Sequence, residues 1–145
     1  MQADSLSLKY RTAMIADDDP IMREVLLSLL CQAGFQVVGE AATTDRAILL
    51  FQSKRPEIVC LDLGMPGLGG LDALANIRAA SSEVIILVIS ADTTERNVRK
   101  AAEIGADGII AKPFTMERLT SEIARTLERR RSAAATAGAA GPVQS

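Results

Sequence analysis

The feature that most constrains the fold is an alternation between short β-rich apolar runs and longer segments with helical periodicity. Five runs have the length and β-branched content of strands, and each is followed by a segment whose apolar residues recur at helical spacing. Strands that alternate with helices form parallel βαβ units, with helices on both faces of the sheet. We therefore expect a doubly wound α/β protein with five helices. The predicted strands are 12–16, 35–41 (half polar, at an edge), 58–63, 84–89 and 108–111.

Capping residues and helix breakers indicate where the helices begin and end. The predicted starts are Asp19-Pro20, Thr43 or Thr44, Leu71, Asp92 or Thr93, and Thr115. The predicted ends are Gly34, Lys54, Ala79 and Gly105, with the last helix continuing through Leu127. On the first helix, the face expected to be buried carries Met22, Val25, Leu26, Leu29 and Leu30.

Length and composition indicate one soluble domain. The 145 residues are 48% hydrophobic and 23% charged, and the net charge of −2 gives no general attraction to nucleic acid or to an anionic membrane. The N-terminus has no apolar signal region, and the longest apolar run, 84–89, is too short to cross a bilayer. We expect a cytoplasmic protein with an N-terminal extension (1–10), one domain (11–131) and a disordered, low-complexity tail (132–145).

Two residue types narrow the possible chemistry. The chain has no histidine, which excludes histidine acid–base catalysis, histidine metal ligands and a phosphohistidine carrier. Cys31 and Cys60 form no CxxC pair and lie in apolar segments, so both are predicted to be buried and reduced.

Polar residues follow four of the predicted strands. Asp17 and Asp18 end the first strand, Asp62 the third, Ser90 the fourth and Lys112 the fifth. In an open parallel sheet the carboxyl ends of the strands form the functional crevice. An all-oxygen acidic cluster favours a hard cation, first of all Mg²⁺. A carboxylate beside Mg²⁺, a lysine and a hydroxyl suits nucleophilic attack on phosphorus.

These residues lie in four motifs, in order along the chain: IADDDP, LDLGMPGLGGLDAL, ISAD and KPF. The motifs resemble those of the receiver domain of two-component response regulators, and the resemblance covers 11–131. It implies a flavodoxin-like sheet with the strand order 2-1-3-4-5. It also implies a donor that is a histidine kinase or histidine phosphotransfer protein, and a protein rather than a nucleic acid as the downstream target.

The resemblance also implies residue roles. Asp62 would accept the phosphoryl group and also bind Mg²⁺. Asp18 would bind Mg²⁺ directly, and Asp17 would bind it largely through water. The Gly64 backbone carbonyl would be a further metal ligand. Ser90 would be the switch hydroxyl and Lys112 would bind phosphate, with Lys112–Pro113 expected to be a cis peptide that helps to aim the lysine.

Two positions depart from the family pattern. Ile109 occupies the switch position in the last strand, where the family usually has Tyr or Phe, so the usual aromatic readout is in doubt. Gly64, two residues beyond the acceptor, has no side chain to guide or obstruct an attacking water, which leaves the dephosphorylation rate open.

Simpler interpretations exist for several motifs. Adjacent acids are common at solvated helix N-termini, and Asp19 is expected to be only an N-cap. The GLGG stretch fits no phosphate-binding loop and is interpreted as a turn. The basic run 129–131 is expected to be a solvated complement to the end of the last helix.

The favoured function is a stand-alone receiver that signals by protein contact or phosphorelay and is not a turnover enzyme. One alternative is a haloacid-dehalogenase-type aspartyl-phosphate phosphatase, which usually needs a second acid at the position that Gly64 occupies. The other is a degenerate receiver that serves as a scaffold.

Overall fold

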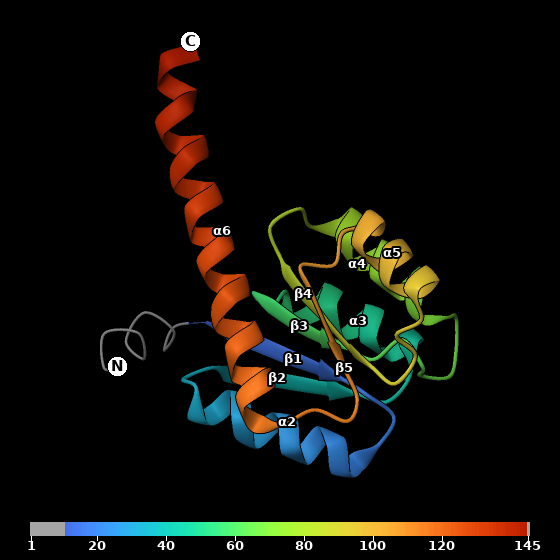
Figure 1. The fold of residues 1–145 in the computed structure, drawn as a ribbon. Coiled ribbons are helices and arrows are strands. Elements are labelled where there is room, and N and C mark those ends of the chain that lie inside the picture. Colours follow the sequence, from blue (N-terminus) through green and yellow to red (C-terminus); the bar gives the residue numbers. More distant parts are fainter. Residues whose placement is uncertain (1–10, 145) are drawn as a thin grey trace.

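Five parallel strands form a single sheet in the order β2-β1-β3-β4-β5, as predicted (Figure 1). The computed structural model describes the backbone of residues 11–144 and the side chains of residues 11–133, so the predicted extension 1–10 lies outside the described residues. The strands are β1 (Thr12–Ala16), β2 (Gln36–Ala41), β3 (Ile58–Leu61), β4 (Ile85–Ser90) and β5 (Gly108–Ala111). The helices are α2 (Pro20–Gln32), α3 (Thr44–Lys54), α4 (Gly70–Ala80), α5 (Glu95–Ile104) and α6 (Met116–Gln144).

Helices cover both faces of the sheet (Figure 1). Helices α2 and α6 pack on one face through Leu30 and Ile123, whereas α3, α4 and α5 cover the other through Phe51, Leu74 and Ala101. Because side chains alternate along a strand, every residue of β4 is buried against one helical layer or the other. This double burial explains why β4 is the most hydrophobic strand.

Helix starts largely follow the predicted capping residues. The Asp19 carboxylate accepts a hydrogen bond from the Ile21 amide at 2.9 Å, and the Thr43 hydroxyl accepts one from Arg46. The predicted cap of α5, Asp92 or Thr93, is wrong, because the cap is Thr94, whose hydroxyl accepts from the Asn97 amide. Three consecutive residues, Asp92, Thr93 and Thr94, could cap this helix. Because residues 91–93 are not helical, the third of them stands at the helix start.

The two cysteines differ in environment. Cys60 lies in β3 and is buried, and this burial raises the pKa of its thiol to about 12. The prediction that Cys31 is buried is wrong, because this residue is exposed on α2. The buried stripe of α2 is formed by Leu26, Leu29 and Leu30, and Cys31 lies one residue beyond it. Val25, also expected on the buried face, is exposed at the other edge of this stripe.

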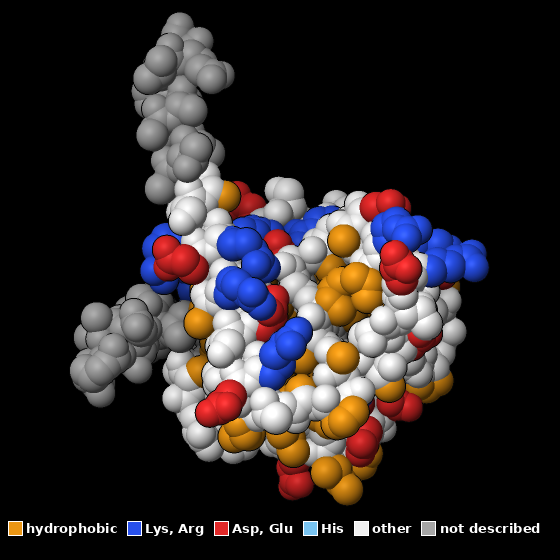
Figure 2. All heavy atoms as spheres, viewed as in Figure 1, with side chains coloured by type: hydrophobic (Ala, Val, Ile, Leu, Met, Phe, Trp, Pro, Cys, Tyr) orange, Lys and Arg blue, Asp and Glu red, His pale blue; other side chains and the backbone are white. Residues whose placement is uncertain are grey.

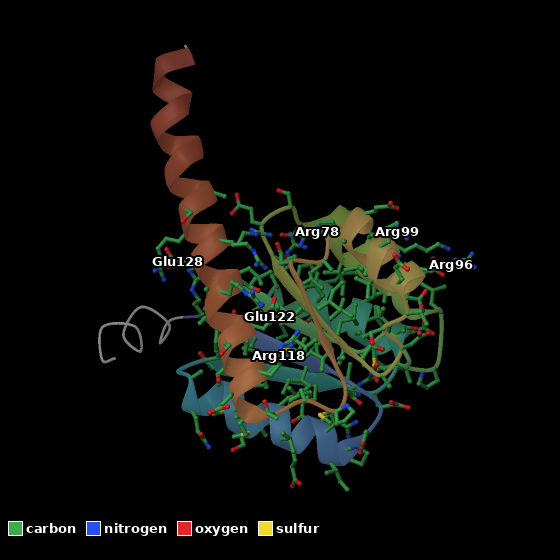
Figure 3. The ribbon with its side chains drawn as sticks, in the orientation of Figure 1. Arg78, Arg96, Arg99, Arg118, Glu122 and Glu128 are labelled. Carbon is green, nitrogen blue, oxygen red and sulfur yellow. The ribbon has the colours of Figure 1, made fainter. Side chains whose placement is uncertain are left out.

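Asp107, just before β5, joins three elements at the amino end of the sheet. Its carboxylate accepts from Arg78 of α4 at 2.8 Å, from Arg130 of α6 at 3.0 Å and from the Ile86 amide at 2.8 Å (Arg78 is labelled in Figure 3). Arg130 also donates to the carbonyls of Glu83 and Val84. The prediction that the basic run stays solvated is therefore wrong for Arg130, which fastens α6 to the sheet.

The face around α5, β5 and α6 is rich in basic side chains. Figure 2 shows Lys and Arg over both helices, with hydrophobic side chains between them. Arg96 and Arg99 extend from α5, and Arg118 lies on α6 (Figure 3). Arg99 pairs with Glu95 at 3.4 Å, but both side chains are largely exposed, so this pair adds little to stability. The charges of Arg99 and Glu95 therefore remain open to solvent.

Helix α6 continues beyond the domain and projects away from the sheet (Figure 1). The sequence predicts a disordered tail from residue 132. The backbone is helical through Gln144, but the side chains beyond residue 133 lie outside the described residues, so the tail stays a prediction. Within the described part of the chain, no helix combines the length and apolar character needed to span a membrane.

Deleting residues 132–145 is expected to leave the melting temperature within about 2 °C of the full-length value, as for surface changes that remove no core contact. The last α6 residue in the hydrophobic core is Leu127, and Arg130 would be retained. Thermal unfolding followed by circular dichroism measures this. A matched deletion of residues 129–145 also removes Arg130 and should lower the melting temperature clearly. A large loss from the shorter deletion would show that the tail stabilises the domain.

Candidate functional site

Four strand ends bring the predicted site residues to one edge of the sheet. Asp17 follows β1 and Asp62 follows β3; the residues before them, Ala16 and Leu61, are paired in register. Ser90 ends β4 and lies opposite Ala111 of β5, which Lys112 follows. Because the strands are parallel and in register, their polar end residues meet at the same edge, as the sequence predicts.

Three carboxylates are close together at this edge. Asp17, Asp18 and Asp62 each offer an oxygen atom, and these atoms all lie within 4.8 Å of one another. Asp17 and Asp62 are buried, whereas Asp18 is exposed. Carboxylates that are buried together repel one another, and a nearby cation offsets this repulsion.

Lys112 supplies one positive charge to the cluster. Its Nζ lies 2.6 Å from Asp17 Oδ2 and 3.3 Å from Asp62 Oδ2. Burial alone would lower the pKa of Lys112, but the hydrogen bond to Asp17 and the negative charges of Asp62 and Asp17 outweigh this and raise the pKa above its usual value. The lysine is therefore positively charged at neutral pH.

Backbone amides hold the other oxygen of each buried carboxylate. The Asp19 amide donates to Asp17 Oδ1 at 2.9 Å, and the Gly64 amide donates to Asp62 Oδ1 at 3.0 Å. Each carboxylate is thus fixed between a backbone amide and Lys112. This arrangement sets the orientation of Asp62 before any ligand arrives.

The remaining predicted residues, Ser90, Ile109 and Pro113, lie at the end of β4, within β5 and just beyond β5. The buried Ser90 hydroxyl accepts a hydrogen bond from the Asp92 amide at 3.2 Å. Ile109 pairs with Val88 within the sheet and is half-buried, packed with the α3–α5 layer. The Lys112–Pro113 peptide is cis, as predicted.

The donor atoms at this edge fit a hard divalent cation. Asp17, Asp18 and Asp62 offer only oxygen, which suits Mg²⁺, and a divalent cation would offset charge that Lys112 alone does not neutralise. Both Asp17 oxygens already accept hydrogen bonds, from Asp19 and Lys112, whereas Asp18 is open to solvent. The donor set of these three carboxylates therefore fits an Mg²⁺ site.

Comparison with known proteins identifies the family. A family model for the response regulator receiver domain matches residues 13–124. The chain belongs to this family. Chemotaxis protein CheY of Thermotoga maritima is 32% identical over 113 residues, which cover 78% of this chain and 94% of that protein. The nitrate/nitrite response regulator NarL of Escherichia coli is 37% identical over 109 residues, covering 74% of this chain and 50% of NarL.

Solved structures agree with this assignment. A two-component response regulator of the LuxR family from Aurantimonas sp. superposes with a TM-score of 0.76 at 34% identity, covering 83% of this chain and 86% of that one. A chain of the CheX–CheY–BeF3–Mg²⁺ complex from Borrelia burgdorferi gives a TM-score of 0.80 at 23% identity, covering 86% and 98%. Because the identity in the second match is only 23%, this match supports the fold alone.

Sequence reasoning missed two residues that support the site. Arg23 of α2 donates to the Asp17 carbonyl at 2.7 Å and pairs with Glu40 at 3.1 Å. Thr44 is fully buried and binds the loop that follows Asp62. Neither has a sequence signal of its own, because an arginine on a helix and a threonine at a helix start are both common.

Asp18→Ala is expected to weaken Mg²⁺ binding roughly tenfold or more, because it removes a charged oxygen ligand. Asp19→Ala removes only the N-cap of α2 and should lower the melting temperature with little effect on Mg²⁺ affinity. Isothermal titration of both variants measures this order. Equal affinities in the two variants would contradict the assignment of Asp18.

Proposed function

We propose that the protein accepts a phosphoryl group on Asp62 from a histidine kinase or histidine phosphotransfer protein, and that it signals by protein contact or phosphorelay. The observation that supports this most is the convergence of Asp62 with Asp17, Asp18 and Lys112. Asp62 is 6% exposed, yet it lies at the sheet edge where a donor can approach. It is also the acid of the cluster whose orientation depends on both Lys112 and the β3–α4 loop.

The transfer exchanges one bond to phosphorus for another. A carboxylate oxygen of Asp62 forms a bond to phosphorus while the P–N bond of the phosphohistidine breaks. The imidazole leaves with the electron pair of that bond and takes up a proton. The product is an acyl phosphate on Asp62.

The protein contributes mainly positioning and charge. Lys112, already 3.3 Å from Asp62, pairs with a phosphoryl oxygen as negative charge is transferred. When bound at Asp17, Asp18, Asp62 and the Gly64 carbonyl, Mg²⁺ supplies further neutralisation of that charge. The Ser90 hydroxyl, now bonded to the Asp92 amide, turns toward the phosphoryl group and donates a hydrogen bond to it.

The alternatives receive less support. A phosphatase of the haloacid-dehalogenase type usually requires an acid where this chain has Gly64, and this glycine uses its amide to hold Asp62. A receiver that served only as a binding scaffold would not require Lys112 to lie between two buried carboxylates. The exposed basic and hydrophobic side chains around α5 and α6 offer a surface for a downstream protein in the cytoplasm (Figure 2).

Acetyl phosphate with Mg²⁺ is expected to add one phosphoryl group to the protein, and Asp62→Asn should abolish this addition because an amide is a poor nucleophile. Intact-protein mass spectrometry with and without a chelator measures it. Asp45→Asn, on the exposed side of α3, is the matched control and should be labelled normally. Equal labelling of Asp62→Asn would place the acceptor elsewhere.

Phosphorylation, or a beryllofluoride mimic, is expected to shift the backbone amides near Ser90 and Asp92 more than those beyond Ile109. Ile109 has no ring to rotate, and its β-branched side chain is stiff at χ1. Amide chemical shifts in the two states measure the difference. Uniformly large changes along α6 would show a conventional rearrangement without the aromatic residue.

A further inference from the structure

The loop between β3 and α4 is bound by a residue from a distant part of the chain. This loop, residues 63–69, carries Gly64, whose amide holds the Asp62 carboxylate. Thr44, the first residue of α3, contacts the far end of the loop. The Thr44 side chain is 0% exposed, so its hydroxyl depends on protein partners for hydrogen bonds.

Thr44 binds two loop residues at once. Its Oγ1 accepts a hydrogen bond from the Leu68 amide at 2.6 Å, and its own amide donates to the Pro66 carbonyl at 3.1 Å. The hydroxyl also lies 3.5 Å from that carbonyl. One residue of α3 therefore satisfies backbone groups on both sides of Gly67.

The loop passes very close to this hydroxyl. Gly67 has a φ of +118°, and a Cβ atom at this position would lie 2.4 Å from Thr44 Oγ1. Met65, between Gly64 and the bound residues, is buried in the core. Where the loop meets α4, a Cβ on Gly70 would lie 2.2 Å from the Leu63 carbonyl oxygen. The segment from Asp62 to α4 is therefore tightly packed, and Thr44 of α3 holds it by hydrogen bonds from another part of the chain.

We propose that Thr44 is a positioning residue for the phosphoacceptor site. By holding Pro66 and Leu68, it fixes the path of the loop and so the place of Gly64. The Gly64 amide orients Asp62, and its carbonyl belongs to the proposed Mg²⁺ ligands. This inference rests on the proposed function. The neighbouring Thr43 acts differently, because its hydroxyl accepts from Arg46 and caps α3 alone.

The two adjacent threonines allow a matched test in the full-length protein. Thr44→Val removes the loop-binding hydroxyl at nearly constant shape, Thr43→Val removes the capping hydroxyl, and Thr44→Ser keeps the loop-binding hydroxyl. Thr44→Val is expected to raise the Mg²⁺ dissociation constant roughly tenfold, as when a group supporting a metal ligand is lost. It should also speed hydrogen exchange of the Leu68 amide. Thr44→Ser should restore both properties, whereas Thr43→Val should lower only the melting temperature.

Several outcomes would overturn the proposal. One is unchanged Mg²⁺ affinity or unchanged Leu68 exchange in Thr44→Val. Another is equal weakening by Thr43→Val, which would indicate a general loss of α3. If Thr44→Val does not fold, Thr44→Ala takes its place with the same expected order. Failure of the wild-type protein to bind Mg²⁺ would refute the proposed function instead, and Leu68 exchange would still test the contact with Thr44.

Discussion

The contact of Lys112 with two buried carboxylates is the interaction on which the functional edge depends. Lys112 is 95 residues from Asp17 and 50 residues from Asp62 along the chain, so only the completed sheet brings the three together. Without a positive charge between them, two buried carboxylates would repel each other. The order of the strands, the burial of β1 and β3 and the charge state of the site are therefore linked. A chain that misplaced β5 would leave this acidic pair unneutralised.

At the opposite, amino end of the sheet, the protein itself compensates the charge of an acidic residue. Asp107 is held by two arginines and a backbone amide, so its charge is fully compensated by the protein itself. The carboxyl end has three carboxylates and one lysine, so it keeps more negative than positive charge. The protein itself thus balances the charge at the amino end, whereas the carboxyl end retains an electrostatic imbalance that a ligand can relieve. Such a division is common where function requires a site that is not at its own stability optimum.

Much of this arrangement could be predicted because it depends on local signals and one general rule. Apolar runs locate the strands, and the rule for parallel sheets then gathers Asp17, Asp62 and Lys112 at one edge. Local sequence signals do not predict features that depend on contacts between distant segments of the chain. Nothing local tells that Arg130 reaches Asp107 or that Thr44 binds Leu68, and three consecutive capping residues before α5 cannot be ranked from sequence alone.

The unequal environments of the two cysteines have a practical consequence. Thiol reagents react with the thiolate, which the high pKa and burial of Cys60 suppress, while Cys31 is open to solvent. A maleimide dye at neutral pH should therefore attach to α2 alone, at a defined position, without any engineered substitution. Since the chain contains no tryptophan, this dye would be the dominant fluorophore. The natural sequence thus already supplies a single-site optical reporter on the helix that follows the acidic cluster.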